Sequence, residues 1–280
     1  MSGGALVLVG TPIGNLGDLS PRAIEAFAAA DAVACEDTRR TGRLLAHIGV
    51  RVPVLIVMND HTELEVLDGI LRRLDGGERV VVVSDAGMPG ISDPGERLVA
   101  AAAASGHRIE VVPGPSAAVT ALVGSGLPTG RFVFEGFLPR KGSGRTERLS
   151  ELAMERRTIV LYEAPHRLQR TLGDLIAVCG VARRVAFGRE LTKLHEEFWR
   201  GTLGEAFDRC EEVEPRGEYV LVLDGAPAPG EVTDDQLLEA LAAARARGES
   251  TRDAVAGVAE RFGAAKRHVY DLATGSVSSD

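Results

Sequence analysis

Short apolar runs alternate with stretches of helical length over the first 112 residues. The runs hold four to six residues, are rich in valine and other strand-forming side chains, and are bounded by glycine, proline or aspartate. They span residues 5–10, 32–35, 54–58, 79–84 and 108–112. Between them, apolar positions recur with the period of a helix at residues 20–30, 38–47, 63–74 and 93–105. This β-α-β-α order predicts a mostly parallel sheet with helices on its faces.

Two of the expected helices begin with capping signals. Ser20 and Asp93 each precede a proline, which is favoured at the first helical position. Glu96 stands where a capping box places its acid. We therefore expect Asp93 to cap the helix that follows it.

A second set of strands and helices follows a change of composition at residues 124–130, where glycine, serine, proline and threonine gather. Strands are expected at 132–136, 158–162, 185–188, 197–200 and 219–223, and helices at 146–155, 165–179 and 203–210. The last strands lie close together in sequence, so this sheet is expected to be mixed. The chain thus predicts two α/β domains, 1–127 and 128–226, that face each other across a cleft.

The character changes again after the proline- and glycine-rich stretch 224–230, which is typical of a linker. Residues 231–280 show helical periodicity only, with glycines at 248 and 263 between three short helices. This pattern predicts a small bundle of the helix-turn-helix type. An appendage for dimerisation or packing fits the same pattern.

Charge is distributed unevenly along the 280 residues. The whole chain carries a net charge of −8, yet residues 139–200 hold 13 lysines and arginines against 8 aspartates and glutamates, a net of +5. A locally basic segment is typical of a face that binds a polyanion, and equally of a solvated helix surface. The three cysteines are far apart, no signal peptide precedes the first strand, and no apolar run reaches membrane-spanning length. We expect a soluble cytoplasmic protein without a metal site.

Three loops that follow expected strands are rich in glycine, proline and polar side chains: 10–18, 84–95 and 113–117. Ligands of open α/β sheets bind at the carboxyl ends of the strands, where such loops meet. The first loop lacks the spacings of dinucleotide- and phosphate-binding loops, so a phosphate cradle is disfavoured. Any one loop fits a tight turn, but three together favour a ligand site. Asp85 is a suitable acceptor there for an amine or a ribose hydroxyl.

Titratable side chains gather after two strands of the second half. Residues 162–167 contain glutamate, histidine and arginine, and residues 189–193 contain arginine, glutamate and lysine. A single histidine after a strand is more often a cap or a surface residue than a catalyst. The density of titratable groups at two strand ends favours an active site that faces the cleft.

Seven sequence motifs together resemble the tetrapyrrole methylase superfamily. They are V-G-T-P-I-G-N-L-G-D-L-S-P-R-A, A-C-E-D-T-R-R-T, S-D-A-G-M-P-G-I-S-D-P-G, V-P-G-P-S-A, G-F-L-P-R-K, Y-E-A-P-H-R and R-E-L-T-K-L-H-E-E. Within the superfamily they resemble the ribosomal RNA small subunit methyltransferase I family, from about residue 6 to residue 224 and in the final helices. Corrin and sirohaem methylases differ, because they carry glycine at the position of Ser84 and lack the basic motifs at 136–141 and 162–167. The charged residues of both motifs lie in the basic segment, which favours an RNA acceptor.

The resemblance implies a fold, a cofactor and a substrate. The fold would be two α/β domains with S-adenosylmethionine (AdoMet) in the cleft between them, in a homodimer. The acceptor would be the ribose 2′-hydroxyl of a decoding-region cytidine in 16S rRNA, within the small ribosomal subunit. The residues expected at the cofactor are Pro12, Asp85, Gly87, Met88, Ser116, Ala117, Tyr162 and Leu191. A corrin- or sirohaem-type methyltransferase and a non-catalytic RNA- or partner-binding protein are the alternatives.

Position and chemistry suggest further roles in the second half. Lys193 is the first candidate for a general base or hydroxyl-orienting group, since a desolvated lysine can titrate near neutrality. Glu163 and His166 are the alternatives, and salt bridges across the cleft would explain all three equally well. Contacts to RNA phosphate are expected from basic side chains of the second half, namely Arg140, Lys141, Arg145, Arg148 and Arg167.

Overall fold

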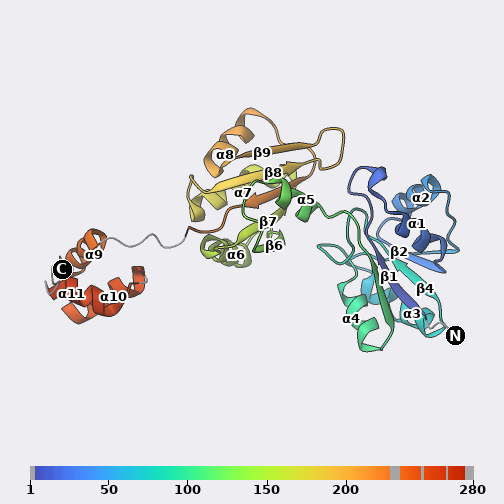
Figure 1. Ribbon diagram of the computed structural model, residues 1–280, viewed down its shortest axis with the longest axis horizontal. Coiled ribbons are helices and arrows are strands. Elements are labelled where there is room, and N and C mark those ends of the chain that lie inside the picture. The colour runs from blue at the N-terminus through green and yellow to red at the C-terminus, as the bar shows by residue number, and fades with distance from the viewer. Residues whose placement is uncertain (1–3, 228–233, 247–248, 263, 275–280) are drawn as a thin grey trace. The chain divides into compact units, whose positions relative to one another are not determined.

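The structure is a computed structural model that describes residues 4–227, 234–246, 249–262 and 264–274. Packing divides the chain into two compact units, Met1–Ala226 and Pro227–Asp280. The larger unit holds two five-stranded sheets, one in each half. The predicted class of two α/β halves followed by a helical segment is therefore confirmed (Figure 1).

The first sheet is wholly parallel and has the strand order β3-β2-β4-β1-β5. Its strands are β1 (Ala5–Val9), β2 (Ala32–Cys35), β3 (Val54–Val57), β4 (Arg79–Val82) and β5 (Arg108–Val112). Strands β1, β2 and β4 are buried on both faces, which explains why their sequences are apolar runs without alternation. The carboxyl ends of all five strands meet at one edge, where the three predicted ligand loops begin.

Four helices cover the two faces of this sheet: α1 (Pro21–Ala28), α2 (Thr38–His47), α3 (Glu63–Asp75) and α4 (Glu96–Ala104). Helices α1 and α2 bury Phe27 and Leu45 on one face, and α3 and α4 bury Ile70 and Leu98 on the other (Figure 1). Ser20 caps α1 as predicted, with its side chain accepting a hydrogen bond from the Ala23 amide. A short 3-10 turn, η1 (Leu16–Asp18), follows the first loop.

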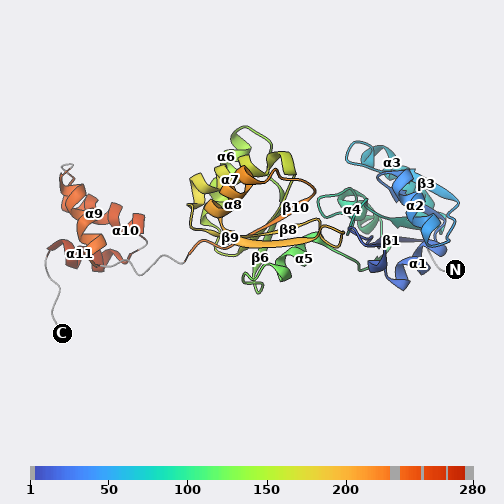
Figure 2. The same cartoon turned by 90° about the horizontal axis from the view of Figure 1, so that it is seen from above.

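The second sheet is mixed, as predicted, with the order β6-β7-β10-β8-β9. Its strands are β6 (Phe132–Phe137), β7 (Thr158–Glu163), β8 (Arg184–Arg189), β9 (Glu197–Thr202) and β10 (Tyr219–Leu223). Only the β6–β7 pair is parallel; the other pairs are antiparallel. One face is covered by α6 (Ser143–Met154), α7 (Pro165–Cys179) and α8 (Leu203–Glu212), and the other by α5 (Ala117–Gly124) (Figure 2).

Helix α5 was not predicted, and it moves the division between the two halves. Its side chains Ala118, Ala121 and Leu122 are buried against Val160 and Val220 of the second sheet. The helix therefore packs with the second half, although the predicted boundary between residues 127 and 128 follows it. Its sequence, A-A-V-T-A-L-V-G, is apolar nearly all round, so it lacks the amphipathic period by which a helix is recognised.

The smaller unit contains the three predicted helices, α9 (Asp234–Ala246), α10 (Thr251–Phe262) and α11 (Lys266–Thr274). They enclose a core of their own that includes Leu237, Val255 and Val269. The predicted breaks at Gly248 and Gly263 lie outside the described residues. Among the helices that the structure describes, none has both the length and the apolar character needed to cross a membrane.

Candidate active site

The three predicted ligand loops are joined to one another at the carboxyl edge of the first sheet. The amide of Thr11 donates to the carbonyl of Gly87 at 2.9 Å, and the amide of Gly87 donates to the carbonyl of Thr11 at 3.2 Å. A Cβ on Gly10 would lie 2.6 Å from the Cα of Gly114. Glycine is therefore required where the first and third loops touch, and the loops form one rigid wall.

The first loop also reaches the second half of the unit. Ile13 is 8% exposed and packs with Leu191 and Val220 in the cluster that contains α5. The Asn15 amide donates to the Thr192 hydroxyl at 3.0 Å. Sequence reasoning missed Ile13, although an apolar side chain inside a glycine-rich loop is a signal for such docking.

A cavity of about 320 Å³, here called the cleft cavity, lies between the loops of the first half and strands β7, β8 and β10 of the second. Six of the eight predicted cofactor residues line it: Gly87, Met88, Ser116, Ala117, Tyr162 and Leu191. Pro12 and Asp85 line an adjoining rim cavity of about 550 Å³. The two cavities share Ile13, Ala86 and Glu218 as walls, so they lie next to each other. Their volumes lie in the range of roughly 300–1,000 Å³ that small-molecule sites occupy.

An aromatic group forms one side of the cleft cavity. Tyr162 meets Phe134 edge-on at 5.1 Å between ring centroids, and Phe137 at 5.5 Å. Phe137 is 53% exposed and lines the cavity, so its ring is available to a ligand. Burial raises the pKa of the Tyr162 hydroxyl, so Tyr162 remains protonated at neutral pH.

The prediction that Asp93 caps α4 is wrong. The helix begins at Glu96, and its N-cap is Gly95, which makes no side-chain cap. Glu63, at the start of α3 and only 5% exposed, accepts hydrogen bonds from the amides of Gly95 and Leu98, each at 3.1 Å. The N-terminus of α4 is thus satisfied by another helix, and the Asp93 side chain lines the cleft cavity. Sequence reasoning missed this role.

Carboxylates gather beside Asp93 at the ends of β2, β3 and β4. The Glu36 side chain accepts from the Asp85 amide at 2.9 Å, and Arg40 lies 3.4 Å from the Asp85 carboxylate. Burial raises the pKa of Glu36, and the negative charge of Asp85 adds to the effect. For Asp93, burial and the charge of Glu36 together raise the pKa to about 7. This side of the cleft is therefore acidic and suits a cationic ligand.

The structure contradicts the basis on which Lys193 was proposed as a base. Its Nζ lies 2.9 Å from the carboxylates of Glu190 and Glu218. Partial burial opposes the charged form, but the hydrogen bonds to Glu218 and Glu190 outweigh it and raise the pKa of Lys193. A lysine held in its ammonium form does not accept a proton near neutrality. Lys193 lines the rim cavity, so a role in orienting a hydroxyl stays a prediction.

Glu163 lines the cleft cavity but is bound into the protein. It is 3% exposed, one oxygen accepts from the Thr171 hydroxyl at 2.5 Å, and the other accepts from the Ala164 amide at 2.9 Å and pairs with Arg167. His166 is exposed and lines neither the cleft cavity nor the rim cavity. The geometry thus offers neither residue a free proton-accepting position in the cavity, and their catalytic roles stay predictions.

Two of the five arginines and lysines predicted to contact RNA are bound to other groups of the protein. Arg145 is 4% exposed and donates to Asp174, to the Pro139 carbonyl and to the Thr171 hydroxyl. The Arg167 side chain is 18% exposed and donates to the Leu138 carbonyl at 2.7 Å while pairing with Glu163. These contacts hold the basic loop that precedes α6. The Arg145 guanidinium has no exposed face left for a phosphate, and contact of Arg167 with RNA stays a prediction.

The other three predicted RNA contacts have exposed side chains. Arg140 and Lys141 lie in the loop between β6 and α6, and Arg148 lies on α6. Arg148 forms ion pairs with Glu135 at 2.5 Å and with Glu151 at 2.7 Å. Arg140 and Lys141 take part in none of the ion pairs found among the described residues. Contact of these three side chains with RNA stays a prediction.

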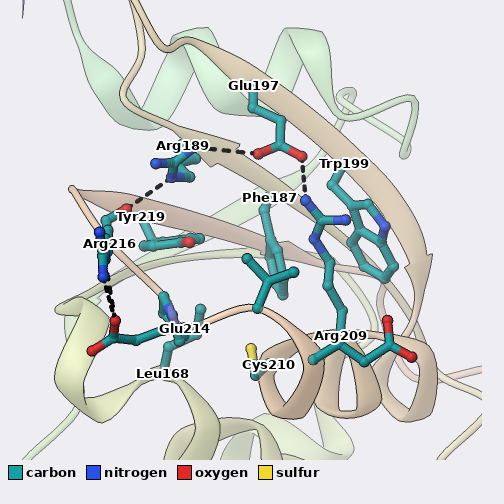
Figure 3. A pocket seen from close by; sticks show the side chains of 13 residues that line it. Leu168, Phe187, Arg189, Glu197, Trp199, Arg209, Cys210, Glu214, Arg216 and Tyr219 are labelled. Carbon is teal, nitrogen blue, oxygen red and sulfur yellow. Dashed lines mark hydrogen bonds and ion pairs between the residues drawn. The ribbon is translucent and has the colours of Figure 1, made fainter.

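A separate cavity of about 380 Å³ lies on the face of the second sheet that α7 and α8 cover (Figure 3). Its floor is apolar and consists of Leu168, Phe187, Trp199, Cys210 and Tyr219. Its arginines are paired with glutamates of the same cavity: Arg189 and Arg209 with Glu197, and Arg216 with Glu214 (Figure 3). The charges balance, so this cavity does not suit a polyanion, and the cleft cavity remains the candidate site.

Comparison with known proteins agrees with this geometry. A family described as Tetrapyrrole (Corrin/Porphyrin) Methylases matches residues 5–206. A protein of Synechocystis named ribosomal RNA small subunit methyltransferase I is 45% identical over 271 residues, which cover 96% of this chain and 97% of its own. The protein of the same name from Escherichia coli O157:H7 is 42% identical over 274 residues, with 97% and 95% covered.

Solved structures of tetrapyrrole methyltransferases share the fold. The methyltransferase CobJ superposes with a TM-score of 0.61 at 24% identity, over 80% of this chain and 95% of its own. A uroporphyrin-III C-methyltransferase from Thermus thermophilus, solved in complex with S-adenyl homocysteine, gives a TM-score of 0.55 at 22% identity, over 79% and 97%. The chain therefore belongs to the tetrapyrrole methylase family and, within it, to the ribosomal RNA small subunit methyltransferase I family.

Proposed function

We propose that this chain transfers the methyl group of AdoMet to the ribose 2′-hydroxyl of a decoding-region cytidine in 16S rRNA. The observation that carries the proposal is the cleft cavity, because residues of the motifs that resemble the rRNA methyltransferase family line its walls. The acceptor nucleoside and its ribose position come from the resemblance of those motifs. We further propose that the substrate is the assembled small subunit and that the protein works as a cytoplasmic homodimer.

The residues of the cleft fit AdoMet. The apolar side chains Ile13, Leu191 and Val220 offer contacts to an adenine ring, and Tyr162 and Phe137 supply aromatic edges and faces. The carboxylates of Asp85 and Asp93 favour the positive charges of an amine and a sulfonium. The rigid backbone of the three joined loops reduces the ordering needed on binding.

The arrangement supports transfer by alignment. AdoMet supplies an electrophilic methyl group on a sulfonium, which is already a good leaving group. The protein must hold the acceptor oxygen in line with that methyl group, exclude water and provide a place for the proton. Positioning alone is worth about 7–11 kcal/mol in favourable cases, so a rigid cavity without a metal is sufficient for this chemistry.

The exposed pair Arg140 and Lys141 supports an RNA acceptor. These side chains extend from the loop that follows β6, whose last residue, Phe137, lines the cleft cavity. Phosphate contacts beside the cavity would hold an RNA strand with one nucleotide at the methyl group. Arg145 and Arg167 donate hydrogen bonds to the carbonyls of Pro139 and Leu138 and so hold the start of the same loop in place.

A corrin- or sirohaem-type acceptor is the weaker proposal. The solved tetrapyrrole methyltransferases share the fold at identities below 25%, whereas the rRNA methyltransferases match at 41–48% over most of the chain. Incubation with methyl-labelled AdoMet and one of three acceptors separates the classes: small subunits that lack this methylation, naked 16S rRNA, or uroporphyrinogen III. We expect label in the subunits. Label in the tetrapyrrole alone would overturn the proposal.

A further inference from the structure

Three carboxylates line the cleft cavity: Asp93, Glu163 and Glu218. A base for the acceptor hydroxyl must be one that keeps a free oxygen at the cavity. Both oxygens of Glu163 are engaged by Thr171, Ala164 and Arg167 within the protein. The Glu218 side chain is 78% exposed and bound to Lys193 at the rim. Asp93 alone of the three takes part in none of the ion pairs found among the described residues.

The turn that carries Asp93 has a constrained backbone, and the Asp93 side chain lines the cleft cavity. Ser92, the residue before it, has φ of +60°, which is unusual for a residue other than glycine. The Gly90 amide donates to the Pro94 carbonyl at 3.1 Å and closes the turn. Across the cleft, a Cβ on Gly136 would lie 2.9 Å from the Ser92 hydroxyl, so β6 packs closely against this turn. Glu63 accepts the hydrogen bonds of the α4 N-terminus, so the Asp93 carboxylate is not needed to cap that helix.

The charges that face Asp93 are mostly negative. Glu36 follows β2, Asp60 follows β3 and Asp85 follows β4, and all three disfavour ionisation of Asp93. Arg40, on α2, is the nearby cation and lies beside Asp85.

From the second half, Tyr162 faces Asp93 with a protonated hydroxyl. The Ser84 hydroxyl is a hydrogen-bonding partner of Asp93 and favours the carboxylate. The balance raises the pKa of Asp93 to about 7, which suits a group that must take up and release a proton at neutral pH.

We propose that Asp93 is the general base of the methyl transfer, accepting the proton of the ribose 2′-hydroxyl as that oxygen attacks. This inference rests on the proposed function. The O2′–methyl bond forms while the sulfur–methyl bond breaks, and its electron pair stays on the sulfur as a neutral thioether. The hydroxyl proton moves to the Asp93 carboxylate, which becomes a carboxylic acid. It passes to solvent after the products leave, and no oxidant or metal is consumed.

The kinetic test is a single-turnover methylation of small subunits by labelled AdoMet between pH 5.5 and 9. For the wild type, we expect a rate that rises with pH and levels off at or below about 7, because the sulfonium charge in the loaded protein favours the carboxylate. Asp93→Asn should lose about 100-fold or more in rate at saturating AdoMet, far more than it loses in AdoMet affinity in calorimetry, and should lose the inflection. The matched control is Asp60→Asn, an exposed carboxylate that lines neither cleft cavity nor rim cavity. It should keep the plateau rate and move the inflection to lower pH.

A second measurement needs no activity. In the folded state the pKa of Asp93 is raised above its unfolded value of 3.8, so folding takes up a proton between pH 4 and 7. The wild type should therefore lose stability as pH rises through this range, and Asp93→Asn should lose less. The melting temperature of the variant minus that of the wild type should be larger at pH 8 than at pH 5. A difference independent of pH would overturn the proposal.

The outcomes separate this inference from the proposed function. If the wild type labels no RNA, the proposed function fails, whatever Asp93 does in the melting experiment. If the wild type labels the subunits and Asp93→Asn does so at the same rate with the same inflection, only the inference fails. If Asp93→Asn loses AdoMet binding in proportion to its rate, Asp93 is a cofactor ligand and the base assignment is overturned. A variant that labels slowly, without the inflection and with AdoMet bound, supports it.

Discussion

Replacing Arg145 by methionine is expected to lower the free energy of unfolding by about 2–4 kcal/mol. The sequence suggested that this arginine contacts RNA, but its side chain is only 5% exposed in the structure. Methionine keeps most of the apolar stem and removes the guanidinium. The substitution therefore separates the hydrogen bonds of the charged group from the packing of its stem.

The magnitude follows from the three partners that Arg145 leaves behind. Each hydrogen bond, to Asp174, to the Pro139 carbonyl and to the Thr171 hydroxyl, is 2.9 Å long. Hydrogen bonds from a charged group contribute about 1.5–3 kcal/mol each. The sum is not lost in full, since Asp174 is 35% exposed and can be hydrated, and Thr171 keeps its bond to Glu163. The loss should thus lie well below three full bonds.

The assay is urea unfolding followed by the fluorescence of Trp199, the single tryptophan of the chain. Its ring packs 5.1 Å from that of Phe187 in the same half as Arg145, so it reports on the unit in question. The matched control is Arg170→Met, which shares the acceptor Asp174 at 3.9 Å but is 64% exposed. An exposed pair of this kind contributes about 0–1 kcal/mol. Equal losses for the two variants would refute the structural role of Arg145.

Three further predictions concern the loops and the RNA face. Gly10→Ala should lower stability by about 1–3 kcal/mol and weaken AdoMet binding in calorimetry, because its Cβ would meet the backbone of the facing loop at 2.6 Å. Glu63→Ala should cost about 1–3 kcal/mol in urea unfolding and also weaken AdoMet binding, since it uncaps α4 next to the second loop. The double substitution of Arg140 and Lys141 by alanine should reduce the salt dependence of binding to small subunits by a slope of about 0.7–0.9 per lost phosphate contact, with AdoMet affinity unchanged.

Controls for the first two predictions lie in the same half of the unit. Gly42→Ala, inside α2 with no atom within 4 Å of the added Cβ, should stabilise the protein by about 0.5–1 kcal/mol. Glu65→Ala, exposed and two residues after Glu63, should change stability little. A Gly10→Ala variant as stable as the wild type would contradict the close contact of the loops. Loss of AdoMet binding on substitution of Arg140 and Lys141 would place them at the cofactor instead.

Most of the fold was predictable because its strands and helices differ in period and are separated by turn residues. Strand β5 and helices α2 and α7 begin and end where their sequences predict. Helix α5 was missed because its exposed side carries the valines Val119 and Val123, so the helix has almost no polar face. A segment of this kind has a sequence that neither helix nor strand periodicity distinguishes.

Most of the predicted cofactor residues line the cleft cavity, so the place of the cavity was predictable from the motifs, but the contacts of the charged residues were not. Their roles depend on partners that are distant in sequence. Glu218, 25 residues away, keeps Lys193 in its ammonium form. Glu63, on the helix before α4, caps α4 in place of Asp93. Arg145 is buried through Asp174 on α7. No local pattern reports such tertiary contacts, so a strand-end lysine or a basic helix residue fits both catalytic and structural roles equally well.

The measurement that tests the central claim most directly is the location of the transferred methyl group. Small subunits from cells that lack this protein would be incubated with it and labelled AdoMet, and the 16S rRNA would then be digested to nucleosides and identified by mass spectrometry. We predict label in 2′-O-methylcytidine, from a single decoding-region position, and no label after the cleft cavity is filled by Ala117→Trp. Label on a base, label spread over many positions, or full transfer by the filled variant would contradict the account.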